Sequence, residues 1–225
     1  MSCIVRHAIL LDGAFLIKKL QSRIQRFPSA SDVQAVATSI VNHAFVSGQS
    51  CLRIYFYHAR PAAEMLFNPI SKRTIKLRFT QIHIDHSRLL QELEKAPDFA
   101  LRLGETDVTG WKVGDSALRR LVRIPRPLQA DDLVPAIEQK GVDLRIGLDI
   151  ARLALTHSVE TIVAVTADSD LVPAFKFARR EGLRVVLCHL GHRVKRELLT
   201  HADRIMTIDL PTFSHAQRTP ENAAA

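Results

Sequence analysis

The sequence predicts an α/β fold built around a mainly parallel sheet, and three observations support this prediction. Short apolar runs alternate with segments of helical spacing, most regularly between residues 142 and 208. An alternating order of strands and helices implies right-handed crossovers, which place successive strands parallel in one sheet. The length of 225 residues suits one domain with a sizeable hydrophobic core.

Apolar runs and helix breakers define four elements in the first sixty residues. Asp12 and Gly13 close the first apolar run, and the segment 28–31 (Pro-Ser-Ala-Ser) ends the first helical pattern. Ser31 is a suitable N-cap for the next helix, and Gly48 is a suitable stop. The predicted elements are a strand at 4–11, a helix at 15–24, a helix from 31 to about 46 and a strand at 51–58.

Residues 60–126 are the least regular part of the chain, and we expect an irregular α+β insertion there. A helix is predicted near 87–95. The segment 99–113 predicts a hairpin that turns near Gly104 and Glu105.

The remainder of the chain alternates regularly. Apolar residues at Leu144, Leu148, Ala151 and Leu155 have helical spacing. The predicted elements are a short strand at 133–138, a helix at 142–157, a strand at 161–166, a helix at 170–181, a strand at 183–188, a helix at 193–201 and a strand at 204–208. We expect a single domain over residues 1–210 and a disordered polar tail at 211–225.

The charge balance indicates a polyanionic partner. The chain has thirty-one Lys and Arg residues and twenty-three Asp and Glu residues, which gives a net charge of +8. The excess gathers in four clusters: Lys72, Arg73, Lys76 and Arg78; Arg119, Arg120, Arg123 and Arg126; Lys176, Arg179, Arg180 and Arg184; Arg193, Lys195 and Arg196. A solvated face explains any one cluster, but four clusters favour nucleic acid over a membrane surface. The first cluster is our candidate for nucleic-acid binding.

The cellular setting predicted from the sequence is the cytoplasm. No apolar run is long enough to cross a bilayer, and the N-terminus lacks a signal-peptide cleavage pattern. Cys3, Cys51 and Cys188 are widely spaced and odd in number, which suits reduced thiols rather than a disulfide framework or a zinc motif.

Four aspartates follow or flank predicted strands. Asp12 ends the first strand, Asp143 opens a helix after a loop, and Asp168 and Asp170 follow the strand at 161–166. Parallel strands would bring them to one edge of the sheet, where open α/β sheets bind ligands. A purely structural alternative is that the last two belong to a helix cap, with Ser169 or Asp170 as the cap.

Carboxylates packed together repel one another unless a cation lies among them. Oxygen ligands without His or Cys favour Mg²⁺ or Mn²⁺ over zinc. Such a metal can activate water and stabilise the developing charge in phosphodiester hydrolysis.

Three motifs in this order resemble the NYN domain, a family of PIN-like metal-dependent ribonucleases, and in particular its bacterial LabA-like group. They are LLDGAFL, QKGVDLRIGLDIARLA and VTADSDLVPAFKFARREGLRVVL, spread from residue 9 to about 188. The resemblance implies a three-layer α/β/α sandwich with Asp12, Asp143, Asp168 and Asp170 at the metal site. It also gives Asp149 a supporting role. The stretch 60–126 has no counterpart in the pattern, and substrate preference would be determined there.

The chain departs from the family pattern at two places. Ala14 and Phe15 follow the first aspartate where many members have Asn, and Ala167 stands where Gly is frequent. Neither change removes a carboxylate, although the missing Asn removes a potential contact with substrate or water.

Three further polar residues are candidates for supporting roles. Lys140 could contact a phosphate or be a solvated loop lysine. Thr166 and Ser169 flank the acids and could hold the attacking water or orient a carboxylate.

We therefore expect an endoribonuclease that uses Mg²⁺ or Mn²⁺ on single-stranded or structured RNA, with a homodimer as a possible assembly. The alternative is a nucleic-acid-binding regulatory protein that keeps the fold but cleaves little. A phosphatase of the haloacid dehalogenase type is rejected, because that chemistry needs a second acid two residues after the first aspartate and position 14 is alanine. Nucleotide-binding sites of the P-loop or Rossmann type are not supported either, because no glycine motif of these types follows a strand.

Overall fold

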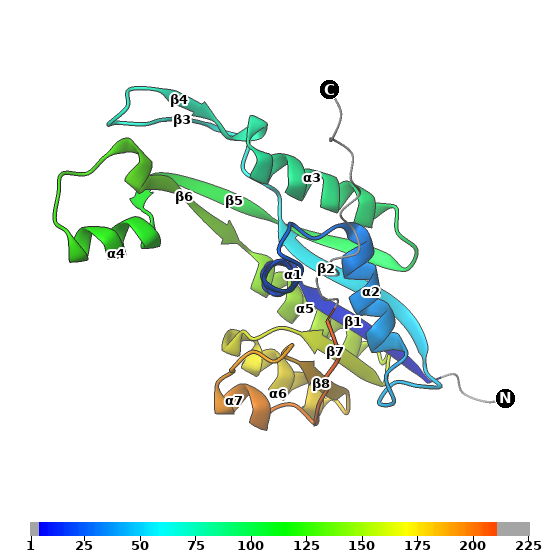
Figure 1. Cartoon of the computed structure of the whole chain (residues 1–225). Coiled ribbons are helices and arrows are strands. Elements are labelled where there is room, and N and C mark those ends of the chain that lie inside the picture. Colours follow the sequence, from blue (N-terminus) through cyan, green and yellow to red (C-terminus); the bar gives the residue numbers. More distant parts are fainter. Residues whose placement is uncertain (1–4, 211–225) are drawn as a thin grey trace, which may run out of the picture.

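The computed structural model describes residues 5–210. A seven-stranded sheet forms the centre of the molecule, and Figure 1 shows how the helices lie around it. The order of strands across the sheet is β6-β5-β2-β1-β7-β8-β9. Their bounds are β1 Arg6–Asp12, β2 Ser50–Ala59, β5 Phe99–Val113, β6 Leu133–Lys140, β7 Thr161–Val165, β8 Arg184–Cys188 and β9 Arg204–Ile205. Every neighbouring pair is parallel except β5 and β6, so the prediction of a mainly parallel sheet is confirmed.

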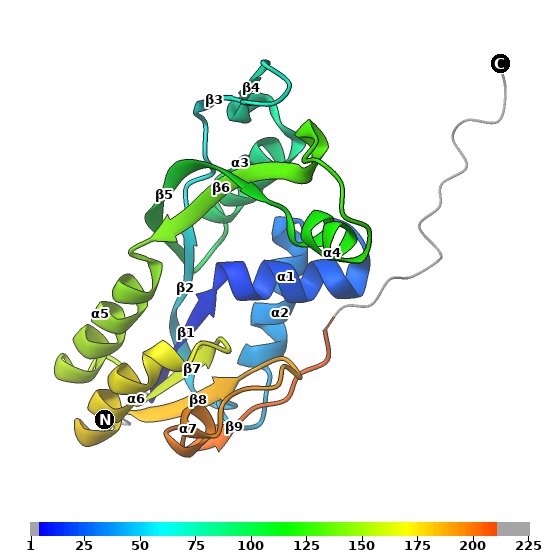
Figure 2. The same ribbon diagram turned by 90° about the vertical axis from the view of Figure 1, so that its left-hand side faces the viewer.

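Helices cover both faces of the sheet, which gives the three layers that the family resemblance implies (Figure 2). One face packs against α5 (Val142–Leu155), α6 (Val172–Arg180) and α7 (Arg196–Thr200). The other packs against α1 (Gly13–Ile24), α2 (Ala30–Val41) and α3 (Gln81–Glu94). Alternate residues of β1 explain the two cores, because Ala8 and Leu10 face one layer while Ile9 and Leu11 face the other.

The helices begin where the sequence supplies caps. Ser29 caps α2 and forms a capping box with Asp32, so the helix begins one residue before the predicted Ser31. It ends at Val41, five residues earlier than predicted, and turns lead from there to Gly48, whose φ is +80°. Thr80 caps α3 through a hydrogen bond from the His83 amide. This helix therefore begins six residues earlier than predicted.

The predicted hairpin within 99–113 is wrong, because that segment is the single strand β5 (Figure 1). Residues 99–104 pair in parallel with β2, and residues 105–113 pair antiparallel with β6, so the real hairpin partner lies twenty residues further along the chain. Gly104 stands where the strand changes partners. A side chain there would collide with the backbone carbonyl of Lys140. The glycine thus permits close approach of two backbones rather than a turn.

The β5–β6 ribbon extends beyond the body of the sheet, and Figure 1 shows α4 (Asp115–Arg123) at its far end. A second hairpin, β3 (Met65–Phe67) and β4 (Thr74–Lys76), lies beside the ribbon, where the Trp111 indole N–H donates to the Phe67 carbonyl at 2.9 Å. The excursion that contains α4 closes at Asp132. Its carbonyl accepts from the Gly114 amide at 2.9 Å, and its carboxylate accepts two hydrogen bonds from Arg126 at 2.6 and 2.8 Å.

The predicted helix at 193–201 is shorter and spans only Arg196–Thr200. The predicted disordered tail at 211–225 lies outside the described residues. Within residues 5–210, every helix is too short or too polar to cross a bilayer.

Candidate metal centre

Asp12 is the last residue of β1 and the N-cap of α1, so the strand delivers its carboxylate to the carboxyl edge of the sheet. One of its oxygens accepts from the Phe15 amide at 3.1 Å, and the other accepts from the Thr166 hydroxyl at 3.2 Å. Both contacts leave lone pairs free, since each carboxylate oxygen can accept more than one partner. The side chain is therefore oriented from two sides and can still bind a cation.

Thr166 directly follows β7 and links two of the candidate acids. Its buried hydroxyl donates to Asp12 and accepts from the Asp168 amide at 3.1 Å. Asp168 in turn accepts from the Asp170 amide at 2.9 Å and caps the short 3-10 turn Ser169–Leu171 that leads into α6. The capping residue is Asp168, and not Ser169 or Asp170 as the structural alternative expected.

Asp143 reaches the same edge from the first turn of α5. Gly141 precedes this helix with φ +71°, a backbone conformation in which a β-carbon is strained. Asp12, Asp143 and Asp168 thus all lie at the N-terminal ends of helices, where the exposed amides and the helix dipole favour negative charge. Such ends also bind phosphate groups.

The pKa values of two of these carboxylates are raised, in part by the charges of the other acids. Burial raises the pKa of Asp12, and the charges of Asp143 and Asp168 raise it further, against the lowering effect of the hydrogen bonds from Phe15 and Thr166. The pKa of Asp143 is raised by burial and then by the charges of Asp168 and Asp170. The four acids predicted from the sequence therefore gather closely enough to repel one another, and only hydrogen bonds compensate that charge in part.

The donor chemistry of this cluster suits a hard divalent cation, because all four side chains offer carboxylate oxygens. Across residues 5–210, however, the structure holds no three His, Cys, Asp or Glu side chains close enough together to form a ready metal site. The backbone positions bring the acids to one edge, while their side chains stand apart from a coordinating arrangement. A cation bound here would reduce the repulsion among the carboxylates and would be coordinated by the lone pairs that their hydrogen bonds leave free.

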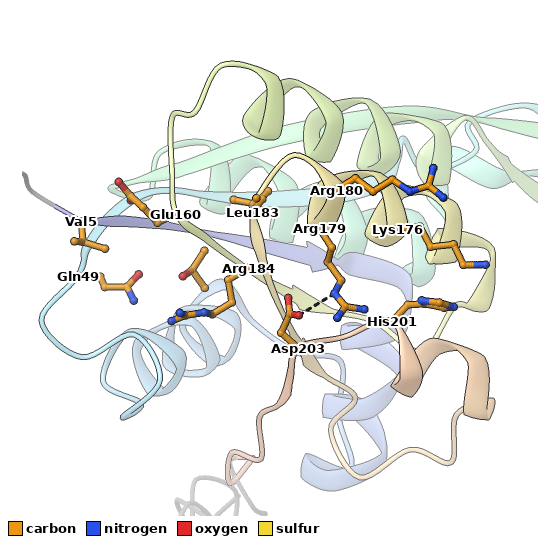
Figure 3. Close-up of a pocket in the computed structure, with 12 residues that line it drawn as sticks. Val5, Gln49, Glu160, Lys176, Arg179, Arg180, Leu183, Arg184, His201 and Asp203 are labelled. Carbon is orange, nitrogen blue, oxygen red and sulfur yellow. Dashed lines mark hydrogen bonds and ion pairs between the residues drawn. The ribbon is translucent and has the colours of Figure 1, made fainter.

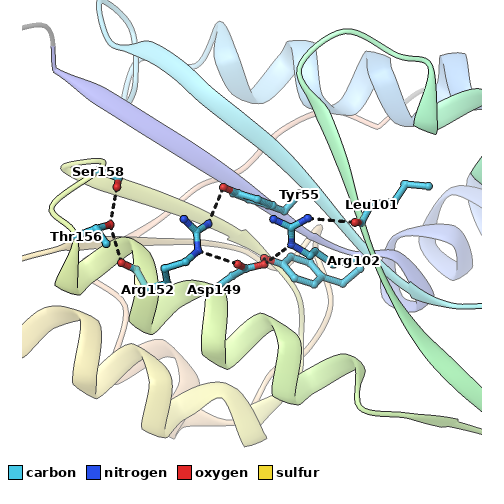
Figure 4. Close-up of polar contacts among 8 residues, drawn as sticks. Tyr55, Leu101, Arg102, Asp149, Arg152, Thr156 and Ser158 are labelled. Carbon is cyan, nitrogen blue, oxygen red and sulfur yellow. Dashed lines mark hydrogen bonds and ion pairs between the residues drawn. The ribbon is translucent and has the colours of Figure 1, made fainter.

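Asp149 lies in an ion-pair network of its own beneath β2 and β5 (Figure 4). Its carboxylate accepts from the Tyr57 hydroxyl at 3.0 Å, from Arg102 at 2.9 Å and from Arg152 at 3.3 Å. Arg152 also donates to the Tyr55 hydroxyl at 2.9 Å. These contacts connect α5 to the sheet, and no local sequence signal predicts them because Tyr57 is 92 residues from Asp149.

The other residues expected near the site lie in several places. Lys140 ends β6 and pairs with Glu138 at 3.1 Å and with Asp107 at 3.8 Å. Ser169 begins the turn after Asp168. The cluster Lys72, Arg73, Lys76 and Arg78 lies in and just after the β3–β4 hairpin, and all four side chains are exposed.

One basic cluster faces away from the acids. Lys176, Arg179, Arg180 and Arg184 line a cavity of about 830 Å³ together with Val5 and Thr161, which stand at the amino ends of their strands (Figure 3). Arg179 pairs there with Asp203 at 2.8 Å. The acids lie at the carboxyl ends of the same strands, so this cavity and the candidate metal centre occupy opposite edges of the sheet.

Residues His83 to His86, with the sequence HIDH, form part of the first turns of α3. The Nδ1 atom of His83 lies 2.8 Å from the Ala62 carbonyl oxygen. The Nδ1 atom of His86 lies 2.8 Å from the ring Nε2 atom of His58. Both rings therefore connect α3 to neighbouring segments.

A comparison with solved structures supports the fold. The chain is similar to a crystallised protein of unknown function from Vibrio parahaemolyticus RIMD 2210633, with 15% identity, a TM-score of 0.53, and coverage of 93% of this chain and 96% of that one. This likeness concerns the fold alone. No curated protein matches the sequence.

The model of the NYN domain matches residues 80–209. The match includes Asp143, Asp168 and Asp170, as well as α3, β5 and α4, whereas Asp12 precedes it. Because the match covers more than half of the chain, the protein belongs to the NYN domain family.

Proposed function

We propose that the protein is an endoribonuclease that requires Mg²⁺ or Mn²⁺ and hydrolyses RNA phosphodiester bonds. Membership of the NYN family, a group with a PIN-like nuclease fold, supports the reaction class. The single observation that carries the proposal is the gathering of four carboxylates, from Asp12, Asp143, Asp168 and Asp170, at helix N-termini along one sheet edge. Burial, and after it the charges of the neighbouring acids, raises the pKa of Asp12 and Asp143.

Each residue has a role that follows from its contacts. The four acids would hold the cation, which when bound would make a water molecule more acidic and stabilise negative charge on the scissile phosphate. Thr166 orients Asp12 and fixes the Asp168 backbone. The amides at the starts of α1 and α5 favour the approach of an anionic phosphate. Asp149 supports this arrangement by connecting α5 to β2 and β5.

The RNA strand is held by positive side chains on the same side of the molecule as the acids. Arg193, Lys195 and Arg196 follow β8 at its carboxyl end and are exposed or partly exposed. Lys72, Arg73, Lys76 and Arg78 present further charge on the β3–β4 hairpin, and Lys140 lies at the end of the ribbon next to α5. We place the protein in the cytoplasm, acting on single-stranded or structured RNA.

The decisive variant is Asp168→Asn, assayed for cleavage of labelled single-stranded RNA and DNA with Mn²⁺, Mg²⁺ or EDTA. Asparagine keeps an oxygen that can accept from the Asp170 amide, so the cap is retained while the charge is lost. Cleavage should fall at least about a hundredfold with an unchanged or higher melting temperature.

Full activity of Asp168→Asn, or cleavage by the wild type in EDTA, would refute the metal centre. RNA binding without any cleavage by the wild-type protein would favour the other candidate, a regulatory RNA-binding protein. The observation on its side is the absence of the Asn that many family members have shortly after the first aspartate, where this chain has Ala14 and Phe15.

A further inference from the structure

The outward face of α5 carries three leucines that the fold does not bury. Leu144, Leu148 and Leu155 are 65%, 61% and 59% exposed. The opposite face of the helix supplies the core residues, among them Ile146 and Ile150. Because the helix is already anchored by that face, the exposed leucines contribute little to folding. A row of exposed apolar side chains on one helix is typical of a contact surface.

Two of these leucines line a groove beside the candidate metal centre. The groove lies between α5 and α6, has a volume of about 340 Å³ and is largely apolar. Leu144 and Leu148 contribute from α5, and Pro173 contributes from α6. Asp143 and Asp170 line it as well, at the starts of the two helices. Leu155 lies at the far end of α5 and does not line the groove.

This combination of charges and apolar walls restricts what can bind. A phosphate is disfavoured in the groove because two carboxylates border it and Arg and Lys residues do not line it. A ligand with apolar faces and N–H donors along its edge is favoured, since its faces cover the leucines and its donors reach the carboxylates. A nucleobase has this chemistry, and proteins often hold an unstacked base between apolar side chains.

We propose that the groove between α5 and α6 binds one unstacked base of the RNA strand, next to the phosphate at the acid cluster. The proposal rests on the proposed function and adds a substrate class to it: strands or loops whose bases are unpaired. A base within a duplex is stacked and paired, so that its release into the groove costs free energy. The cost is smaller for a base in a single strand. The groove therefore selects against double-stranded substrates.

Gly147 keeps the groove open. A β-carbon at this position would lie 3.9 Å from the Ala174 β-carbon, which is ordinary van der Waals contact. Gly147→Ala thus fits without strain and fills part of the groove. The same change favours the helix, because alanine has a higher helix propensity than glycine. Stability and base binding should therefore move in opposite directions.

The test measures binding in EDTA, so that it does not depend on cleavage. Fluorescence anisotropy compares a single-stranded RNA with strands of the same length that carry one abasic position, moved stepwise along the chain. For the wild type, the abasic change should weaken binding about tenfold at one position of the strand, because the apolar contacts of that base with the leucines are lost. In Leu144→Gln/Leu148→Gln this dependence should disappear, whereas Leu155→Gln, the matched control on the same helix, should keep it.

Three outcomes would overturn the proposal. They are equal binding of normal and abasic strands by the wild type, an equal loss in Leu155→Gln, and conversion of a dimer into a monomer by the groove variant in sedimentation analysis. The last result would assign the groove to a second copy of the chain. A wild type that fails to cleave RNA but shows the positional base dependence would contradict only the proposed function.

Discussion

The Thr166 hydroxyl donates to Asp12 at 3.2 Å and accepts from the Asp168 amide at 3.1 Å, so one side chain joins the ends of β1 and β7. The two strands are adjacent and parallel, and their carboxylates would otherwise be held only by their own turns. The position of Asp12 relative to Asp168 is thus determined by a residue that carries no charge itself.

Thr166→Val removes the two hydrogen bonds of the hydroxyl while it keeps the volume of the side chain. Valine fills a similar volume but leaves the Asp168 amide without its acceptor and Asp12 without its donor. We expect a loss of about 1–3 kcal/mol in the free energy of unfolding, measured by urea titration. Cleavage should fall more than stability alone explains. Thr166→Ser is the control and should restore both quantities; a silent Thr166→Val would show that the link has no importance.

Asp12 and Asp143 should lower stability at neutral pH. Their folded-state pKa values are raised above the ordinary value of 3.8, so the folded state binds their protons more tightly than the unfolded state. The stability that they contribute is present below about pH 3.8 and is lost as the pH rises through the folded pKa. Asp12→Asn should therefore melt higher than the wild type at pH 7, with the difference shrinking toward pH 4.

Added Mn²⁺ tests the same repulsion from the other side. It should raise the melting temperature of the wild type by binding only the folded state, and it should do so much less for Asp12→Asn. Lys18→Gln, on the following helix, is a surface control for a one-unit charge change. An identical Mn²⁺ response in all three proteins would argue against a cation at Asp12.

Asp149→Ala should damage stability far more than it damages the chemistry. It leaves the guanidinium groups of Arg102 and Arg152 and the Tyr57 hydroxyl without their shared acceptor. The two arginines are 38% and 47% exposed, so solvent compensates part of the loss, and we expect about 2 kcal/mol. Urea titration measures the cost. A stable Asp149→Ala protein that has lost all Mn²⁺-dependent cleavage would move this residue into the metal centre.

The β3–β4 hairpin should contribute to RNA affinity without affecting metal binding. Replacing Lys72, Arg73, Lys76 and Arg78 by Glu reverses the exposed charge of the hairpin. For every phosphate that the hairpin no longer binds, the slope of log affinity against log salt should become shallower by roughly 0.7 for a single strand. The Mn²⁺-induced shift in melting temperature should stay as in the wild type.

A matched control for the hairpin variant is the replacement of Lys176, Arg180 and Arg184 by Glu at the opposite edge of the sheet. It lowers the net charge by six, against eight for the hairpin variant, and it does so far from the acids. If both variants lose affinity in proportion to their charge change, binding follows net charge and the hairpin has no special role.

Much of the fold could be predicted from the sequence because its signals are local. The strand β7 is buried along its length and apolar after its first residue, and the turn that follows it carries a capping residue. The hairpin prediction at 99–113 failed because a glycine within an alternating run usually marks a turn. Here Gly104 instead allows the Lys140 carbonyl to approach, a contact made across 36 residues of chain that no local pattern reveals.

The candidate site shows the same division. Asp12, Asp168 and Asp170 could be placed because they follow strands, and parallel strands end at one edge. The apolar spacing of α5 predicted a helix but not which face it buries, since the helix has one apolar row toward the core and a second one toward solvent. Only packing against β2 and α6 distinguishes them.

The excursion that contains α4 closes on a single residue, Asp132. Residues 115–131 leave the ribbon and return to one aspartate, whose pKa is lowered to about 2 by the hydrogen bonds from Arg126. The entropy cost of closing such a loop grows only with the logarithm of its length, about 0.6 kcal/mol for each doubling. Residues 115–125 can therefore change in length at small thermodynamic cost, provided that the contact between Arg126 and Asp132 is kept. Such a change leaves the sheet that carries the four acids in place.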